Sequence, residues 1–172
     1  PGDVALVRFT PKGQPDPTFG VGSPFGEGLV VEDIGQNGAN DEGNAIVVLP
    51  GGRILVAGQS DATPFVARFT PEGELDEGFG ESGGYTFVPI DGATRSLAFS
   101  IALVDPDPDS DGDERMLVAG VTFDAAGDSR MFVVQLEAEG FPAPDFGDQG
   151  VLVIDDPGFD SRAHAELTYL EE

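Results

Sequence analysis

One short motif recurs three times along the chain, and internal repetition constrains the possible folds more than any other feature of a sequence. Its copies occupy residues 8–20 (RFTPKGQPDPTFG), 68–80 (RFTPEGELDEGFG) and 135–147 (QLEAEGFPAPDFG). The Phe-Gly pairs that end the copies lie 60 and 67 residues apart. A period of this size predicts that one supersecondary unit is repeated, with units over residues 1–60, 61–122 and 123–172.

Each unit contains short apolar runs that predict β-strands. The runs are rich in Val, Ile, Leu and Phe and are bounded by Gly, Pro or Asp. In the first unit they are VALVRF, GLVVED, NAIVVLP and RILVAGQS, and Gly51 and Gly52 supply the positive φ values of a tight hairpin turn. We therefore expect each unit to be a four-stranded antiparallel sheet. The third unit lacks a counterpart of RILVAGQS and is expected to be incomplete.

Several runs, such as IVVL and VLVI, are apolar at every position, which predicts sheets that are covered on both faces. Four-stranded sheets packed face to face around an axis are the blades of a β-propeller. The expected fold is therefore all-β, a propeller-like array of about three four-stranded antiparallel blades, with a β-sandwich or open stacked sheets as alternatives. Since a ring needs about four to eight blades, other copies of the chain, or the rest of a longer parent chain, are expected to complete its open edges at VALVRF and AELTYLEE.

The motif itself is expected to form a structural corner and not a ligand site. Its glycines permit a positive φ, its aspartates cap a short helical turn, and its phenylalanines fill the space between neighbouring sheets. The third copy has Ala143 in place of the capping aspartate. The residues expected to build the corners are Gly13, Asp16, Phe19, Gly20, Gly73, Asp76, Phe79, Gly80, Gly140, Phe146 and Gly147.

The pattern RFTPxGxxDxxFG, followed by AIVVL and GGRILVAG, resembles the delta-60 repeat of bacterial surface and secreted proteins. The resemblance covers all three units, the first two most specifically. It implies a propeller-type β fold and a location outside the cell or on its surface. It implies no particular biochemical role.

The chain is strongly acidic, with 32 acidic and 8 basic residues, a net charge of −24, and a single lysine, Lys12. A negative field of this size repels phosphate backbones and anionic lipids, so neither nucleic acid nor a membrane surface is an expected partner. No apolar run is long enough to span a bilayer. The acidity fits either a solvated surface, as in a saline habitat, or carboxylates that bind calcium.

The strongest candidate for a metal site is the acidic segment 105–114, DPDPDSDGDE, between two apolar runs of the second unit. Its DxDxDG spacing brings alternate carboxylates onto one Ca²⁺ ion, and the glycine allows the sharp bend. The predicted ligands are Asp107, Asp109, Asp111, Asp113 and Glu114. The segment resembles the calcium loops of integrin-type propellers, and a solvated acidic hairpin tip is the alternative.

The sequence contains no convincing catalytic constellation. His164 is the single histidine, and no GxSxG-like elbow precedes a serine. The absence of cysteine excludes disulfides, thiol nucleophiles and Cys-ligated zinc. With 32 acidic residues, pairs of carboxylates fall within reach of each other by chance and do not indicate a glycosidase. We therefore predict that the chain is not an enzyme.

The predicted function is that of a non-enzymatic surface or secreted propeller segment in structure, adhesion or assembly, with calcium as a candidate stabilising ion. A carbohydrate- or peptide-binding module is the alternative. It needs exposed aromatic platforms, whereas the chain has no Trp and its 13 Phe are expected in the core. A metal-dependent hydrolase, a third possibility, requires acidic residues that converge from several units.

Overall fold

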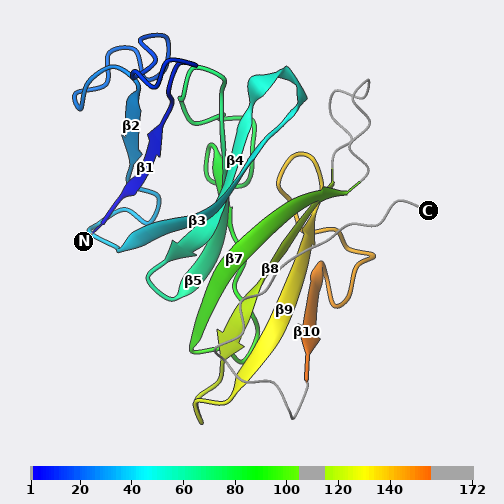
Figure 1. The fold of residues 1–172 in the computed structure, drawn as a ribbon. Coiled ribbons are helices and arrows are strands. Elements are labelled where there is room, and N and C mark those ends of the chain that lie inside the picture. The colour runs from blue at the N-terminus through cyan, green and yellow to red at the C-terminus, as the bar shows by residue number, and fades with distance from the viewer. Residues whose placement is uncertain (1, 105–114, 156–172) are drawn as a thin grey trace.

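The computed structural model describes residues 2–104 and 115–155, and almost all of its regular structure is β-strand (Figure 1). The strands are β1 (Val4–Val7), β2 (Leu29–Glu32), β3 (Asp41–Val48), β4 (Ile54–Ser60), β5 (Thr63–Phe69), β6 (Tyr85–Phe87), β7 (Arg95–Val104), β8 (Arg115–Phe123), β9 (Ser129–Leu136) and β10 (Val151–Ile154). A short 3-10 turn, η1 (Pro50–Gly52), lies between β3 and β4. In these two ranges, no helix is long and apolar enough to cross a membrane.

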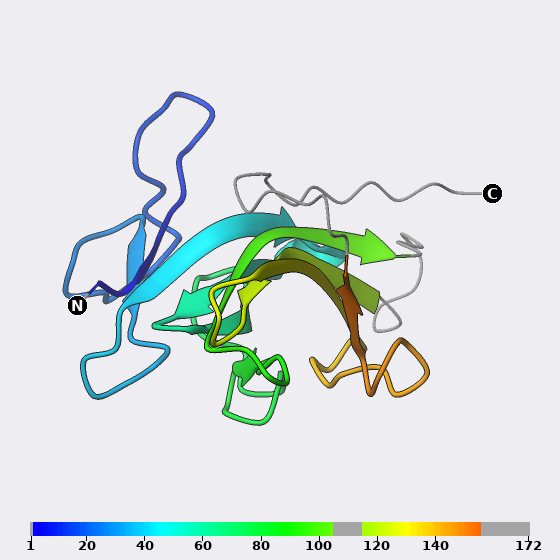
Figure 2. The same cartoon turned by 90° about the horizontal axis from the view of Figure 1, so that it is seen from below.

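The strands form three antiparallel sheets in which neighbours along the chain are also neighbours in the sheet. The first sheet is β1-β2, the second is β3-β4-β5-β6 and the third is β7-β8-β9-β10. Figure 1 shows them in chain order across the molecule, from the blue β1 and β2 to the yellow and orange β9 and β10. Strand β7 contacts β3, β4 and β5 of the second sheet, and the view from below shows β3 and β7 as neighbouring curved strands (Figure 2). The all-β, propeller-like architecture predicted from the sequence is confirmed.

The sheets are not confined to the sequence units that were expected to form them. The second sheet takes β3 and β4 from residues 1–60 but β5 and β6 from residues 61–122. The cause is the β4–β5 hairpin, in which Ser60 pairs with Thr63 and the intervening Asp61 has a φ of 49°. A connection this short forces the two strands that it joins to pair antiparallel. The pairing therefore does not depend on where the sequence repeat is divided.

Among the described residues, the sheet with the fewest strands is the first one, β1-β2. The sequence, in contrast, predicts that the third blade is the incomplete one. Strands β9 and β10, from the third unit, complete a four-stranded sheet with β7 and β8 of the second unit. In the described part of the chain, β1 pairs with β2 alone, so VALVRF does lie at a sheet edge. The other predicted edge, AELTYLEE at residues 165–172, lies outside the described residues.

Two hydrophobic cores lie between the sheets. One core joins Leu6 of β1 to Phe65 and Phe69 of β5, and the other joins Val66 of β5 to Phe132 of β9. Because successive side chains of a strand point to opposite faces, β5 is buried on both sides. Strands β4 and β5, the central pair of the second sheet, are therefore covered on both faces.

The runs IVVL and VLVI do not meet the expectation that both faces are covered, since Ile46 and Val48 are 60% and 65% exposed and Leu152 and Ile154 are 41% and 38% exposed. Within residues 2–104 and 115–155, their strands, β3 and β10, lie at the edges of their sheets and are covered on one face only.

Candidate functional site

The three copies of the motif fold alike, and each consists of a turn followed by a corner. The turns are residues 10–14, 70–74 and 137–141, and the corners are residues 16–20, 76–80 and 143–147. A backbone hydrogen bond closes each turn. In the first turn it runs from the Gly13 N–H to the Thr10 carbonyl, at 2.9 Å. A backbone hydrogen bond also closes each corner. In the first corner it runs from the Phe19 N–H to the Asp16 carbonyl, at 3.1 Å. The local spacing of the motif thus produces the same shape three times.

Aspartate side chains hold the first two corners. Asp16 accepts hydrogen bonds from the Thr18 N–H at 2.9 Å and from the Thr18 hydroxyl at 2.7 Å. Asp76 accepts a hydrogen bond from the Gly78 N–H at 3.2 Å. The Thr18 N–H, the Thr18 hydroxyl and then Arg8 hold the pKa of Asp16 below its usual value. Both aspartates thus satisfy backbone donors, as a capping residue does.

The turn of each later unit lies on the corner of the unit before it, and we call this contact a joint. The Gly20 N–H donates to the Glu72 carbonyl at 2.8 Å, and the Gly80 N–H donates to the Glu139 carbonyl at 2.7 Å. The first of these joints links the first sheet to the second, and the other links the second sheet to the third. The corner residues therefore act between units as well as within them.

Each joint requires glycine where the turn meets the phenylalanine of the corner. A Cβ on Gly73 would lie 2.8 Å from the ring of Phe19, and a Cβ on Gly140 would lie 2.6 Å from the ring of Phe79. The φ values of the two glycines, +96° and +87°, are also unfavourable for other residues. Both rings are fully buried. The burial of the ring therefore depends on the shape of the next unit's turn.

An arginine completes each joint. The Arg8 Nε lies 2.9 Å from a carboxylate oxygen of Asp16, its guanidinium group lies 4.7 Å from the centre of the Phe19 ring, and it donates to the Pro71 carbonyl of the next turn. Ion pairing, a cation–π contact and a hydrogen bond to the following unit thus meet in one side chain.

The second joint repeats these contacts in a more buried place. The Arg68 Nε lies 2.7 Å from Asp76, the guanidinium group lies 4.7 Å from the centre of the Phe79 ring, and its Nη1 donates to the Ala138 carbonyl at 2.7 Å. The side chain of Arg68 is 9% exposed, against 33% for that of Arg8. Because burial strengthens each contact, the second joint is expected to contribute more to stability than the first.

The sequence-based interpretation of the motif missed these arginines. A signal was present, because Arg8 precedes Asp16 by the same distance as Arg68 precedes Asp76. The third copy has lost both members of the pair together, since Gln135 stands in the arginine position and Ala143 in the aspartate position. Two residue types that are both present in two copies of the motif and both replaced in the third are expected to contact each other directly.

One turn and one corner take part in no joint within the described residues. A Cβ on Gly13 would meet no atom within 4 Å, and the carbonyls of Pro11 and Lys12 accept no hydrogen bond from a described residue. At the other end, the Gly147 N–H donates to no described carbonyl, and Phe146 is only half-buried. The first turn and the third corner therefore correspond to the two halves of a joint, and neither half has a partner in the part of the chain that the structure describes.

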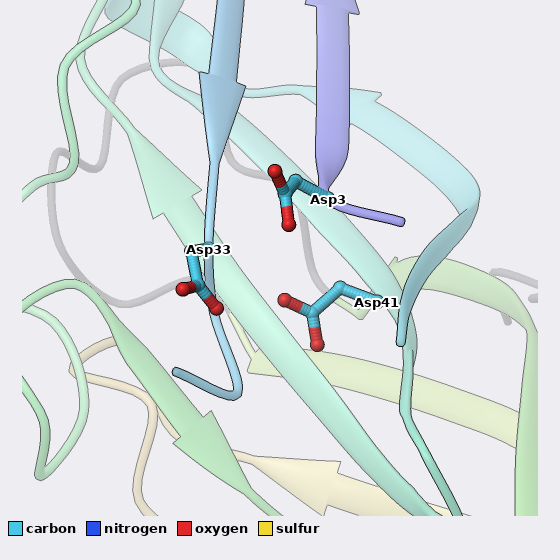
Figure 3. A group of neighbouring side chains, drawn as sticks. All are labelled: Asp3, Asp33 and Asp41. Carbon is cyan, nitrogen blue, oxygen red and sulfur yellow. The ribbon is translucent and has the colours of Figure 1, made fainter. Parts of the chain in front are cut away.

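A separate acidic cluster comprises Asp3, Asp33 and Asp41, whose carboxylate oxygens lie within 4.8 Å of one another (Figure 3). Asp41 is only 3% exposed and accepts hydrogen bonds from the N–H groups of Ile34, at 2.7 Å, and Gly35, at 3.0 Å. Asp3 and Asp33 are exposed. Oxygen ligands of this kind could hold a calcium ion. The observed bonds, however, give Asp41 a structural role, since they tie the loop after β2 to the start of β3.

Two further sequence-based expectations bear on function. The predicted calcium ligands, from Asp107 to Glu114, and His164 lie outside the described residues. The expectation that the phenylalanines lie in the core is only partly met. Among the described residues, the exposed phenylalanines are Phe9, Phe25, Phe87 and Phe141.

Comparison with known proteins supports the architecture and leaves the biochemical role open. The family described as a domain of unknown function (DUF5122) β-propeller has a model that matches residues 49–79. The matched segment contains β4, β5 and most of the second motif copy, up to Phe79. No curated protein and no solved structure matches the chain. The match supports a β-propeller repeat.

Proposed function

We propose that the chain is a non-enzymatic structural module of a bacterial surface or secreted protein, which serves adhesion and assembly. The observation that supports this proposal best is the joint, which occurs twice and links successive sheets. The most distinctive residues of the sequence, the repeated Arg, Asp, Phe and Gly, are used in these joints. A chain whose characteristic residues connect its own units is suited to act as a scaffold, with its loops free for binding.

The proposed location outside the cell rests on the resemblance to the delta-60 repeat and on the net charge of −24. Such a charge keeps a protein soluble and prevents association with anionic polymers and lipids. The β-propeller family match is compatible with a structural module. Adhesion would then use the loops between strands, and assembly would use the joints.

Surface labelling of intact cells tests the location. An antibody raised against the chain should label intact cells of the source organism, or the protein should be recovered from the medium. Protease added to intact cells should remove the label, while a cytoplasmic marker protein in the same cells stays uncleaved. Detection only after lysis would refute the proposed surface or secreted role.

Calcium is the ion that we propose for the acidic segment 105–114, which connects β7 to β8. An ion that binds only the folded chain stabilises it by mass action, by about 2.7 kcal/mol when its concentration is 100 times the dissociation constant. For a chain of this size, that corresponds to an increase in melting temperature of roughly 5–10 °C.

The calcium prediction is tested by melting the protein in millimolar calcium and in EDTA. We expect calcium to raise the melting temperature of the wild type and to have little effect on a variant with Asp109→Asn and Asp111→Asn. Asp41→Asn is the matched control for the second acidic cluster, and it should keep the full calcium response. Equal melting temperatures of the wild type with and without calcium would exclude the ion. A response that Asp41→Asn abolishes would move the site to Asp3, Asp33 and Asp41.

A further inference from the structure

The outer face of the first sheet has the character of an interface. The run VALVRF in β1 corresponds to PFVARF in β5, so Val7 and Phe9 occupy the positions of Ala67 and Phe69. Ala67 and Phe69 are fully buried against the first sheet, whereas Val7 is 51% exposed and Phe9 is 59% exposed. Val7, at the end of β1, and Phe9, two residues after it, therefore lie on the face that, in the second sheet, a preceding sheet covers.

The outer face of the third sheet is the complementary one. Ile154 of β10 occupies the position of Val88, which is buried between the second and third sheets. Leu152 lies two residues before Ile154, on the same face of β10, and these side chains are 41% and 38% exposed. This face corresponds to the one with which the second sheet contacts the sheet that follows it.

The unpaired halves of a joint lie at the same two ends of the molecule. The first turn follows β1, and its Pro11 and Lys12 carbonyls, which correspond to the acceptors Pro71 and Glu72, accept no hydrogen bond from a described residue. The third corner lies between β9 and β10, and its Gly147 N–H donates to no carbonyl in residues 2–104 and 115–155. At each end of the molecule, an apolar face and the residues of a joint are therefore exposed together. Between successive sheets of one chain, the same two features are buried together.

Charge at the two halves favours a second copy of the chain as the partner. In the first joint, Val21 of the corner and Glu72 of the turn line one surface groove. The corresponding residues of the unpaired halves are Asp148, next to Gly147, and Lys12. The only lysine of the chain would thus meet an aspartate, and the contact would place opposite charges together.

We propose that the chain associates head to tail, with the first turn and the β1 face of one copy on the third corner and the β10 face of another. The interface continues the one that occurs twice within the chain, and Gly13 takes the place of Gly73 and Gly140 on the ring of Phe146. Because the third corner has Gln135 in place of arginine, this contact is weaker than the joints within the chain. A heterologous contact of this kind produces a ring or an open filament. The inference rests on the proposed assembly function.

Sedimentation velocity over a range of protein concentrations tests the association. At physiological ionic strength, charges farther apart than about 8 Å are largely screened, so the overall negative charge does not prevent the contact. We expect the wild type to form species larger than the monomer as its concentration rises. Lys12→Glu should weaken the association about tenfold, because it replaces an attraction by a repulsion. Lys12→Glu combined with Asp148→Lys should restore it.

Matched glycine variants test the role of the ring contact. Gly13→Ala should abolish the association, since its methyl group would meet Phe146 of the other copy. Gly92→Ala is the control, because Gly92 has nearly the same φ, +74° against +75°, and a Cβ there also meets no atom within 4 Å. The strain on the monomer is therefore similar in the two variants.

A wild type that stays monomeric at its highest soluble concentration would overturn the proposal. It would also be overturned by oligomers that resist both Lys12→Glu and Gly13→Ala. Neither result would change the surface labelling of intact cells, so failure of the head-to-tail contact is distinguishable from failure of the proposed function.

Discussion

Arg68→Met should destabilise the protein by about 3 kcal/mol, which corresponds to a decrease in melting temperature of roughly 6–12 °C. The variant keeps most of the apolar volume of the side chain but removes three contacts of the guanidinium group. These contacts are the ion pair with Asp76, the hydrogen bond to the Ala138 carbonyl and the cation–π contact with Phe79. The Arg68 side chain is almost fully buried, so water replaces these interactions poorly.

Arg8→Met is the matched control, because Arg8 makes the same kinds of contact in a more exposed place. We expect a loss of about 1 kcal/mol, since exposed ion pairs contribute little. Urea unfolding of the wild type and the two variants measures both values. Equal losses in the two variants would show that burial of the second joint does not matter. A loss below about 0.5 kcal/mol for Arg68→Met would show that the arginine merely fills space.

The class of fold could be predicted from the sequence because its signals are local. Short apolar runs identify strands, and Gly51 and Gly52 adopt positive φ values of 80° and 87° in the tight connection before β4, as the Gly-Gly pair predicts. The repeat then implies that the same sheet-forming element occurs more than once. These signals do not depend on contacts between distant parts of the chain.

The membership of the sheets could not be predicted from the period of the repeat. A period states how far apart equivalent residues lie, but it does not state where one structural unit ends. That boundary depends on which connections are tight hairpins. The β4–β5 hairpin at Asp61 joins strands of two sequence units, and β2 pairs with β1 and not with β3.

Only the corner side of the joint could be predicted from the sequence. The aspartates and phenylalanines of the corner have local roles that a capping pattern and a hydrophobic position indicate. The acceptors of Arg8 and Arg68, however, are backbone carbonyls that lie 63 and 70 residues away. A carbonyl has no residue-type signature, so the partner of each arginine becomes apparent only once the next turn is placed on the corner.

The acidic cluster of Asp3, Asp33 and Asp41 was hidden for a related reason. Its members precede β1, follow β2 and begin β3, and no spacing rule connects three such positions. Asp41 stands out only by its burial and by its bonds to the N–H groups of Ile34 and Gly35. The regular DxDxDG spacing at Asp107 draws attention because it lies within one short segment.

The second and third turns are each joined to the corner before them, and amide hydrogen exchange of the corner glycines tests this most directly. The Gly20 and Gly80 N–H groups donate across the two joints, whereas the Gly147 N–H donates to no described carbonyl. In dilute wild-type protein, where copies do not associate, Gly80 should therefore exchange at least about a hundredfold more slowly than Gly147. Gly20 should exchange at an intermediate rate, because its joint is more exposed. Exchange of Gly80 as fast as that of Gly147 would contradict the joint between the second and third sheets.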